Sequence, residues 1–321
     1  MKICLPDDLY NLVGETAGIT PDVPELSMLT EQLDVLLAVG LNLKTDNFAV
    51  SRIVLHRILT TGLDDIIHYG HRYERTEVLE GSGKLRVHFR NGEFAEGDFL
   101  VAADGVNSAV RKEFLPREFE PVQYGTAGVA GKVFVDDPSA IDFVPVERGI
   151  CIVMSTEGRG VFVAPQRYSP EAKARICELF AGVTNGVTHE AQLPPNATGE
   201  QILLLGGDQK KPLVDDARDY VFFGYVTKHS EEDFGIREIE SIKDISQRGL
   251  LDAVLREMKT RKWSPKLINL VNKTEVNTVG YWPLHLSPRI STLEGHNKPS
   301  NVTFLGDSIH ASKGVMASAC C

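Results

Sequence analysis

The chain has 321 residues, of which 42% are apolar and 24% are charged, a composition that excludes a disordered or fibrous protein. Its 34 basic and 44 acidic residues give a formal net charge of −10, which opposes binding to nucleic-acid phosphates and to anionic lipid. We therefore expect a globular protein of two domains or one large one, without a nucleic-acid partner.

The five cysteines predict neither a metal site nor a disulfide framework. They are scattered, odd in number and lack Cys-x-x-Cys or Cys/His spacing, so we expect reduced thiols and no bound metal. The N-terminus has too short an apolar run for a secretory signal, and no stretch of about 18 apolar residues occurs. The sequence thus predicts a cytoplasmic protein with no membrane span, and it leaves the oligomeric state open.

Two amphipathic helices are predicted to open the chain. Leucines recur at helical spacing across residues 24–41, and apolar residues repeat that pattern across residues 50–63. Short runs rich in β-formers then predict strands at 66–71, 74–79, 84–89 and 98–103. Asn91-Gly92 is a favoured tight-turn pair within this region. We expect a meander that ends in a buried strand.

The middle of the chain is predicted to be mostly β. Strands are expected at 131–135, 149–155, 160–164, 202–205 and 220–226, with a helix at 170–181. Helical spacing returns at 236–259 and 264–272, and a short apolar strand follows at 301–305. The fold class is α/β, with residues 119–295 forming a separate substrate-covering domain between residues 1–118 and 296–321.

Two of the predicted strands end in an acidic residue beside a glycine. Asp104-Gly105 follows one buried strand and precedes a predicted helix, and Gly306-Asp307 follows another buried strand. A helix N-terminus favours anions, glycine lets a ligand approach the backbone, and a carboxylate accepts hydrogen bonds from ribose hydroxyl groups. Each pair alone is more often a plain turn, and only the joint occurrence of the two pairs indicates a cofactor site.

The two pairs together, in this order, resemble a known family. VAADGVNSAVR matches the Asp-Gly motif, and FLGDSIH the Gly-Asp motif, of FAD-dependent monooxygenases with the para-hydroxybenzoate hydroxylase fold. SRIVLHRIL is similar to that family's Arg-x-x-Leu helix. The resemblance runs from about residue 48 to residue 311, and the general sequence pattern is most similar to that of fungal-type secondary-metabolite hydroxylases. It implies an FAD-binding domain built from both ends of the chain, with an inserted β-rich substrate domain.

The resemblance assigns cofactor contacts to five residues. Arg52 would contact the phosphate region of FAD, and Asp104 and Gly105 would lie beside the pyrophosphate and the path of the nicotinamide. Gly306 would let the backbone approach the cofactor, and Asp307 would hold its ribityl or ribose hydroxyl groups. No catalytic residue is assigned, because most of the reactivity belongs to the cofactor.

Three further residues are expected to support the turns. Ser108 and Arg111 would brace the Asp-Gly turn, the hydroxyl as a helix cap and the guanidinium as a partner for nearby carbonyls or phosphate. His310 is expected to buttress the Gly-Asp turn more than to act as an acid or base.

The implied activity is hydroxylation or epoxidation of a small organic substrate, aromatic or a secondary metabolite, with FAD, NAD(P)H and oxygen. Two alternatives to this activity stay open. The first is a non-catalytic remnant or split-enzyme partner of that family. The second is a flavin-dependent reductase or dehydrogenase with the same fold.

The sequence departs from the family at both ends. No predicted strand is followed by GxGxxG, the turn that lets the FAD pyrophosphate reach a helix N-terminus. Gly81-Ser82-Gly83 precedes a strand, and Gly314 alone remains of the glycines expected after His310. We therefore expect a family member truncated at both ends, with weakened FAD binding by this chain alone.

Overall fold

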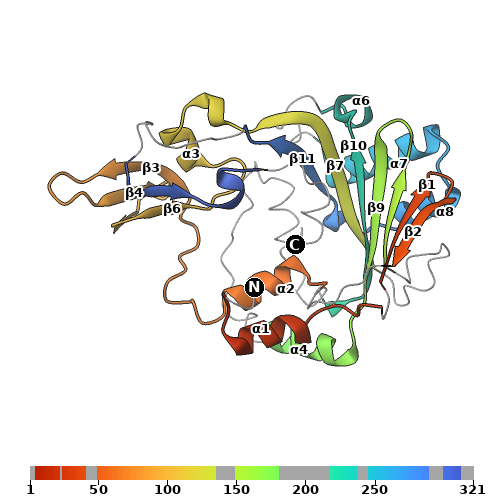
Figure 1. The fold of residues 1–321 in the computed structure, drawn as a ribbon, viewed down its shortest axis with the longest axis horizontal. Coiled ribbons are helices and arrows are strands. Elements are labelled where there is room, and N and C mark those ends of the chain that lie inside the picture. The colour runs from red at the N-terminus through yellow and green to blue at the C-terminus, as the bar shows by residue number, and fades with distance from the viewer. Residues whose placement is uncertain are drawn as a thin grey trace. The chain divides into compact units, whose positions relative to one another are not determined.

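The computed structural model describes residues 4–21, 24–40, 49–134, 149–180, 217–236, 245–288 and 299–311. The chain divides into two units, one of residues 1–63 and 125–282 and the other of residues 64–124 and 283–321 (Figure 1). This division differs from the predicted one because the first strands of the chain pair within the sheet of the middle residues. The domain bounds near residues 118 and 295 stay a prediction.

The first unit is built on a seven-stranded sheet with the strand order β11-β7-β10-β9-β8-β1-β2. Its strands are β1 (Glu25–Thr30), β2 (Val35–Gly40), β7 (Val122–Phe134), β8 (Gly149–Met154), β9 (Arg159–Gln166), β10 (Tyr220–Thr227) and β11 (Gly280–Leu286). The predicted strands at 131–135, 149–155, 160–164 and 220–226 are confirmed, and the one at 202–205 lies outside the described residues.

The helix predicted for residues 24–41 is wrong, because β1 and β2 form an antiparallel hairpin there. The turn between them closes with a hydrogen bond from the Leu33 N–H to the Thr30 carbonyl, and Leu33 has a φ of 71°. β1 also pairs in parallel with β8 along its whole length, from Glu25 to Thr30. The helical spacing of the leucines was therefore overridden by strand pairing with a distant part of the chain.

Helices pack against this sheet in two groups. At the end of the sheet where β7 ends and β10 begins, a cluster of apolar side chains joins α1 (Asp7–Glu15), α2 (Arg52–Leu59) and α4 (Pro170–Phe180). One face of the sheet forms a larger core with α6 (Ser230–Phe234), α7 (Gln247–Thr260), α8 (Pro265–Asn272) and η6 (Val276–Thr278). The helices predicted at 50–63, 170–181 and 264–272 are confirmed, whereas α1 was not predicted. α7 confirms the later part of the helix predicted at 236–259, and residues 237–244 lie outside the described part of the chain.

A buried ion pair ties α6 to the sheet. The guanidinium of Arg159 on β9 donates two hydrogen bonds to the carboxylate of Asp233, at 2.8 and 2.7 Å, and both side chains are buried. Burial by itself would raise the pKa of Asp233, but hydrogen bonds from Arg159, Thr227 and Tyr225 lower it on balance. The unit therefore depends on Asp233 staying ionised.

The second unit contains two smaller sheets. β3 (Tyr73–Val78), β4 (Leu85–Phe89) and β5 (Phe94–Gly97) form an antiparallel meander, and β6 (Leu100–Ala102) pairs in parallel with β12 (Val302–Phe304). Around them lie α3 (Ala109–Phe114), η1 (Arg117–Phe119) and η7 (Gly306–Ser308). Leu85, Val110 and Phe304 are among the residues of their shared core.

Most of the predictions for this second unit are confirmed. The predicted strands at 74–79, 84–89, 98–103 and 301–305 are present, and Gly92 forms the expected tight turn with a φ of 87°. The strand predicted at 66–71 is wrong, because this segment forms turns in which Ile66 and Tyr69 are exposed. No helix in the described part of the chain is both long and apolar enough to cross a membrane.

Candidate cofactor site

The parallel pair of β6 and β12 brings the two predicted turns together. Val302 lies opposite Leu100 and Phe304 opposite Ala102, and the Leu305 N–H continues the ladder with a hydrogen bond of 2.8 Å to the Ala102 carbonyl. The Asp-Gly and Gly-Asp pairs therefore follow two neighbouring parallel strands, and both lie at the edge of the sheet where these strands have their carboxyl ends. In open α/β sheets this edge is where ligands bind.

Both turns contain a glycine with backbone angles that other residues rarely adopt. Gly105 has a φ of 78° and Gly306 a φ of 60°. A Cβ atom added at either position would meet no atom of the described residues within 4 Å. As far as the described residues go, the space beside both glycines is open, so a ligand could approach the backbone of each turn.

Asp104 is exposed, and its carboxylate caps α3. One carboxylate oxygen accepts hydrogen bonds from the main-chain N–H groups of Ala109, at 2.8 Å, and Val110, at 3.4 Å. The hydroxyl of Ser108 accepts from the N–H of Arg111 at 2.9 Å, as expected for a cap. The first N–H groups of α3 therefore have side-chain partners within the turn itself. A contact between Asp104 and FAD stays a prediction.

Asp307 differs from Asp104 in having a carboxylate that is not engaged. It lies in η7, is exposed, and makes no hydrogen bond or ion pair with any residue that the structure describes. A carboxylate in this state is able to accept hydrogen bonds from the hydroxyl groups of a ligand. The chemistry and exposure of Asp307 thus fit the sugar part of FAD, and the contact itself stays a prediction.

Arg111 is a buried residue whose side chain contacts both turns. Its side chain is 1% exposed, and its guanidinium donates to the carbonyl of Val106 at 2.6 Å and to the carbonyl of Ser308 at 2.7 Å. Glu120 forms an ion pair with the same group at 3.2 Å. The expected brace of the Asp-Gly turn is confirmed, and it extends to the Gly-Asp turn, which the sequence did not indicate.

Ser308 is a site residue that sequence reasoning missed. Its buried hydroxyl lies 2.8 Å from the carbonyl oxygen of Ala102 and accepts a hydrogen bond from the Leu305 N–H at 3.1 Å. The hydroxyl therefore bridges the end of β6 and the start of η7. Its place directly after the Gly-Asp pair was the signal that could have drawn attention to it.

His285 and His310 belong to the same unit as the two turns. Burial lowers the pKa of His285 on β11, and the positive charge of Arg111 lowers it further. His310 is exposed, and its main-chain N–H donates to the Gly306 carbonyl at 3.1 Å, so its backbone supports the turn as expected.

Arg52 is the first residue of α2, is exposed, and belongs to the first unit, whereas both turns belong to the second. Its contact with FAD stays a prediction. Among the described residues, no group of three or more His, Cys, Asp or Glu side chains is placed to hold a metal ion.

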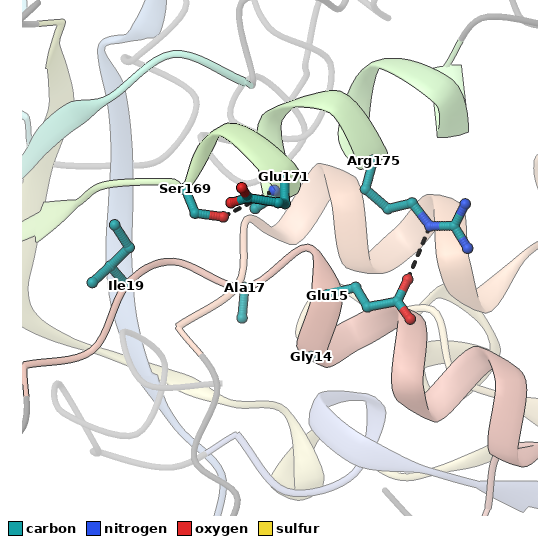
Figure 2. A pocket seen from close by; sticks show the side chains of 8 residues that line it. Gly14, Glu15, Ala17, Ile19, Ser169, Glu171 and Arg175 are labelled. Carbon is teal, nitrogen blue, oxygen red and sulfur yellow. Dashed lines mark hydrogen bonds and ion pairs between the residues drawn. The ribbon is translucent and has the colours of Figure 1, made fainter.

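A hollow of about 420 Å³ lies in the first unit, between the end of α1 and the start of α4 (Figure 2). Its rim includes an exposed ion pair between Glu15 and Arg175, at 2.9 Å, and Ser169 and Glu171 line the other side. None of the predicted site residues lines it. The hollow is therefore separate from the candidate site at the turns.

Comparison with known proteins identifies the relatives of the chain. No family model matches it. It is 24% identical, over 97% of its length, to the dual O-methyltransferase/FAD-dependent monooxygenase CTB3 of Cercospora beticola, and it spans only 33% of that protein. It is 30% identical to the 3-amino-4-hydroxybenzoate 2-monooxygenase of Streptomyces cremeus, over 52% of the chain and 48% of that enzyme. A third relative is the FAD-dependent urate hydroxylase of Klebsiella oxytoca, at 34% identity over 30% of the chain and 26% of that enzyme.

Solved structures show the same fold. A Photorhabdus luminescens protein assigned as a FAD-containing monooxygenase superposes with a TM-score of 0.67 and 20% identity, over 99% of this chain and 70% of that one. HpxO of Klebsiella pneumoniae, solved with FAD and uric acid, superposes with a TM-score of 0.60 and 18% identity, over 94% of this chain and 60% of that one. The predicted α/β fold and the resemblance to FAD-dependent monooxygenases are confirmed.

Proposed function

We propose that this protein is an FAD-dependent monooxygenase that uses NAD(P)H and oxygen to hydroxylate or epoxidise a small organic substrate. The observation that carries the proposal is the parallel pairing of β6 with β12, which lays an open Asp-Gly turn beside an open Gly-Asp turn. CTB3 is named as an FAD-dependent monooxygenase and the Klebsiella oxytoca relative as an FAD-dependent hydroxylase, which supports the same cofactor here.

The residues of the two turns have distinct proposed roles. Asp307 would hold FAD through its sugar hydroxyl groups, while Gly105 and Gly306 would let the cofactor approach the backbone. Asp104 would act mainly by fixing the first turn of α3, and Arg52 is proposed as a contact to the phosphate region. When bound, FAD would supply the redox chemistry, and the protein would orient the reactants and exclude water.

A flat ring compound is the proposed class of substrate. Two of the relatives are named for urate and for 3-amino-4-hydroxybenzoate, both of which are planar rings. This agreement between otherwise distant relatives favours an aromatic substrate over an aliphatic one.

The proposal is tested by the fate of molecular oxygen. The chain is supplied with FAD, NADPH or NADH and a panel of phenols, and oxygen consumption is recorded together with ¹⁸O incorporation from ¹⁸O₂. We expect NAD(P)H oxidation that depends on oxygen and a product carrying one ¹⁸O atom. NAD(P)H oxidation that proceeds without oxygen, with electrons passed to an artificial acceptor, would contradict the proposal and support a reductase.

A further inference from the structure

We propose that two copies of this chain associate through the edge strand β2. The two β2 strands pair antiparallel across a two-fold axis at Ala38, so that the two seven-stranded sheets become one continuous sheet. The inference goes beyond the proposed function, because β2 contains none of the predicted cofactor contacts. It stands whether or not the chain binds FAD.

β2 is an edge strand made only of uncharged residues. It comes last in the strand order of the first unit, so among the described strands only β1 pairs with it (Figure 1). Its sequence, VLLAVG, lacks the lysine and proline residues that often keep an edge strand from pairing with other chains. All six residues are exposed, and the four valines and leucines are between 42 and 64% exposed. The outer edge of β2 is therefore open to a further strand.

A β-bulge turns the apolar side chains of β2 to both sides of the sheet. Leu37 lies opposite Met28, whereas Val35 lies opposite Leu29, so Leu36 is the extra residue between them. Leu29 belongs to the helix-side core, and Met28, its neighbour in β1, consequently faces the other side. A helix laid on one face of the sheet would cover only part of these side chains. A strand added at the edge approaches both faces, which favours an occupant with an extended backbone.

The hairpin that carries β2 is held in place. The Ser264 N–H donates a hydrogen bond of 2.8 Å to the Glu31 carbonyl, and the Gln32 amide donates one of 2.7 Å to the Lys262 carbonyl. β1 also pairs with β8 along its whole length. The edge is therefore ordered before a partner arrives, which lowers the entropy cost of adding a strand.

The charge of the chain favours a second copy as the occupant. Each copy has a net charge of −10, so two copies repel each other on average and associate best where neither is charged, as at β2. The acidic residues Glu31 and Asp34 lie just before β2. Antiparallel pairing keeps the two acidic turns at opposite ends of the joint, whereas parallel pairing would bring them together. Pairing of two identical antiparallel strands also closes on itself, so it gives a dimer and not a fibre.

The part of β2 that follows the bulge sets the register. A two-fold axis between identical antiparallel strands places one residue opposite its own copy. With the axis at Ala38, each Leu37 lies opposite the partner's Val39 on the same face of the joined sheet. Aliphatic cross-strand pairs of this kind stabilise β-sheets. The register thus uses the regular residues of β2 and leaves the bulge outside the central pairs.

Sedimentation analysis of the full chain between about 1 and 100 µM tests the association. We expect a dimer that dissociates on dilution, because one pair of short strands buries less area than the interface of a stable dimer. Leu37→Lys places two ammonium groups near the axis on one face and should raise the dissociation constant more than about tenfold. Ile66→Lys is the matched control, because Ile66 is also exposed but lies in a turn of the second unit.

Two results of this experiment would overturn the proposal. One is a wild-type chain that is monomeric at every concentration, which would leave the edge of β2 to a different protein. The other is a dimer that Leu37→Lys and Ile66→Lys leave equally strong, which would place the contact elsewhere on the chain.

Disulfide cross-linking tests the register. All cysteines except the buried Cys151 are first replaced by serine. Ala38→Cys then brings two thiols to the axis, where opposite Cα atoms lie about 4.5 to 5.5 Å apart, within the range of a disulfide. Val35→Cys is the exposed control, since its copy would lie roughly 20 Å away. We expect a covalent dimer on mild oxidation of Ala38→Cys alone, and its absence there, or equal yields for both variants, would overturn the pairing.

Discussion

Arg111 donates a hydrogen bond of 2.7 Å to the main-chain carbonyl of Ser308, a residue 197 positions later in the sequence. The same guanidinium donates to the carbonyl of Val106, so one buried side chain holds both turns of the candidate site. The two turns, which lie far apart in the sequence, are therefore connected by the hydrogen bonds of one side chain.

Replacing this guanidinium should destabilise the unit. Arg111→Met leaves the carbonyls of Val106 and Ser308 without their donor, and we expect a loss of about 3 kcal/mol in the free energy of unfolding. Ser308→Ala keeps the carbonyl and removes only the hydroxyl, so its cost should be about 1 kcal/mol. Urea denaturation measures both, and equal costs for the two variants would contradict this assignment.

The two aspartates of the turns should respond differently to removal. Asp104→Ala deletes the cap of α3 and should lower stability by about 1 kcal/mol. Asp307→Ala changes a carboxylate without a described partner, so its effect should stay within about 0.5 kcal/mol. Thermal and urea unfolding of both variants provide the measurement. A larger loss of stability for Asp307→Ala would show that the structural roles have been assigned the wrong way round.

The buried pair of Arg159 and Asp233 should make the first unit sensitive to acid. Asp233→Asn removes the buried charge partner of Arg159, leaves it only the exposed carboxylates of Glu157 and Glu232, and should cost about 3 to 5 kcal/mol. Glu15→Gln, which breaks the exposed pair with Arg175, should cost less than about 1 kcal/mol and serves as the control. Because the fold lowers the pKa of Asp233, its stabilisation is present above about pH 4 and is lost as the pH falls further. Acid unfolding of wild type and Asp233→Asn tests this, and identical pH profiles would refute it.

His285 should add a second pH dependence, near neutrality. Its pKa is lowered in the folded chain, so the unfolded chain binds a proton more readily. The stabilisation is complete above about pH 6.5 and decreases as the pH falls through the lowered pKa. His285→Gln should therefore narrow the difference between unfolding midpoints at about pH 7.5 and about pH 5.5.

His71 provides a control of opposite sign. The hydrogen bond that His71 donates to the Glu93 carboxylate raises the pKa of His71, so protonation of this partly exposed ring favours the folded state below the ordinary histidine pKa. His71→Gln should widen the difference between the two midpoints. A change in the same direction for both variants would contradict the roles given to these histidines.

Local sequence patterns predicted most of the fold but not the first sheet strands. Leu26, Leu29, Leu33 and Leu36 fit a helix by spacing, and nothing within residues 24–41 indicates that β8, far along the chain, supplies a parallel partner for β1. The buried positions Ser27 and Leu29 of β1 are two apart, and the turn at Leu33 breaks this alternation before β2. Non-local pairing of this kind cannot be read from periodicity alone.

In the candidate site, the position of the turns was predictable from the sequence, but the roles of their side chains were not. The motifs located both turns, because an apolar strand followed by an acidic residue and a glycine is a local pattern. The tasks of the side chains within the turns were less predictable, since the capping role of Asp104 and the bridge made by Ser308 depend on which main-chain groups lie nearby. Those groups are defined only once β6 and β12 have paired.

We propose that the exposed carboxylate of Asp307 binds FAD at the paired turns. Titration of the full chain with FAD, followed by flavin fluorescence, tests it in wild type, in Asp307→Asn and in Asp65→Asn, an exposed aspartate in a turn of the same unit. We predict that Asp307→Asn weakens FAD binding about tenfold, as expected for loss of charge-assisted hydrogen bonds, while its unfolding midpoint is unchanged and Asp65→Asn binds like wild type. Equal FAD affinity in wild type and Asp307→Asn would contradict the account.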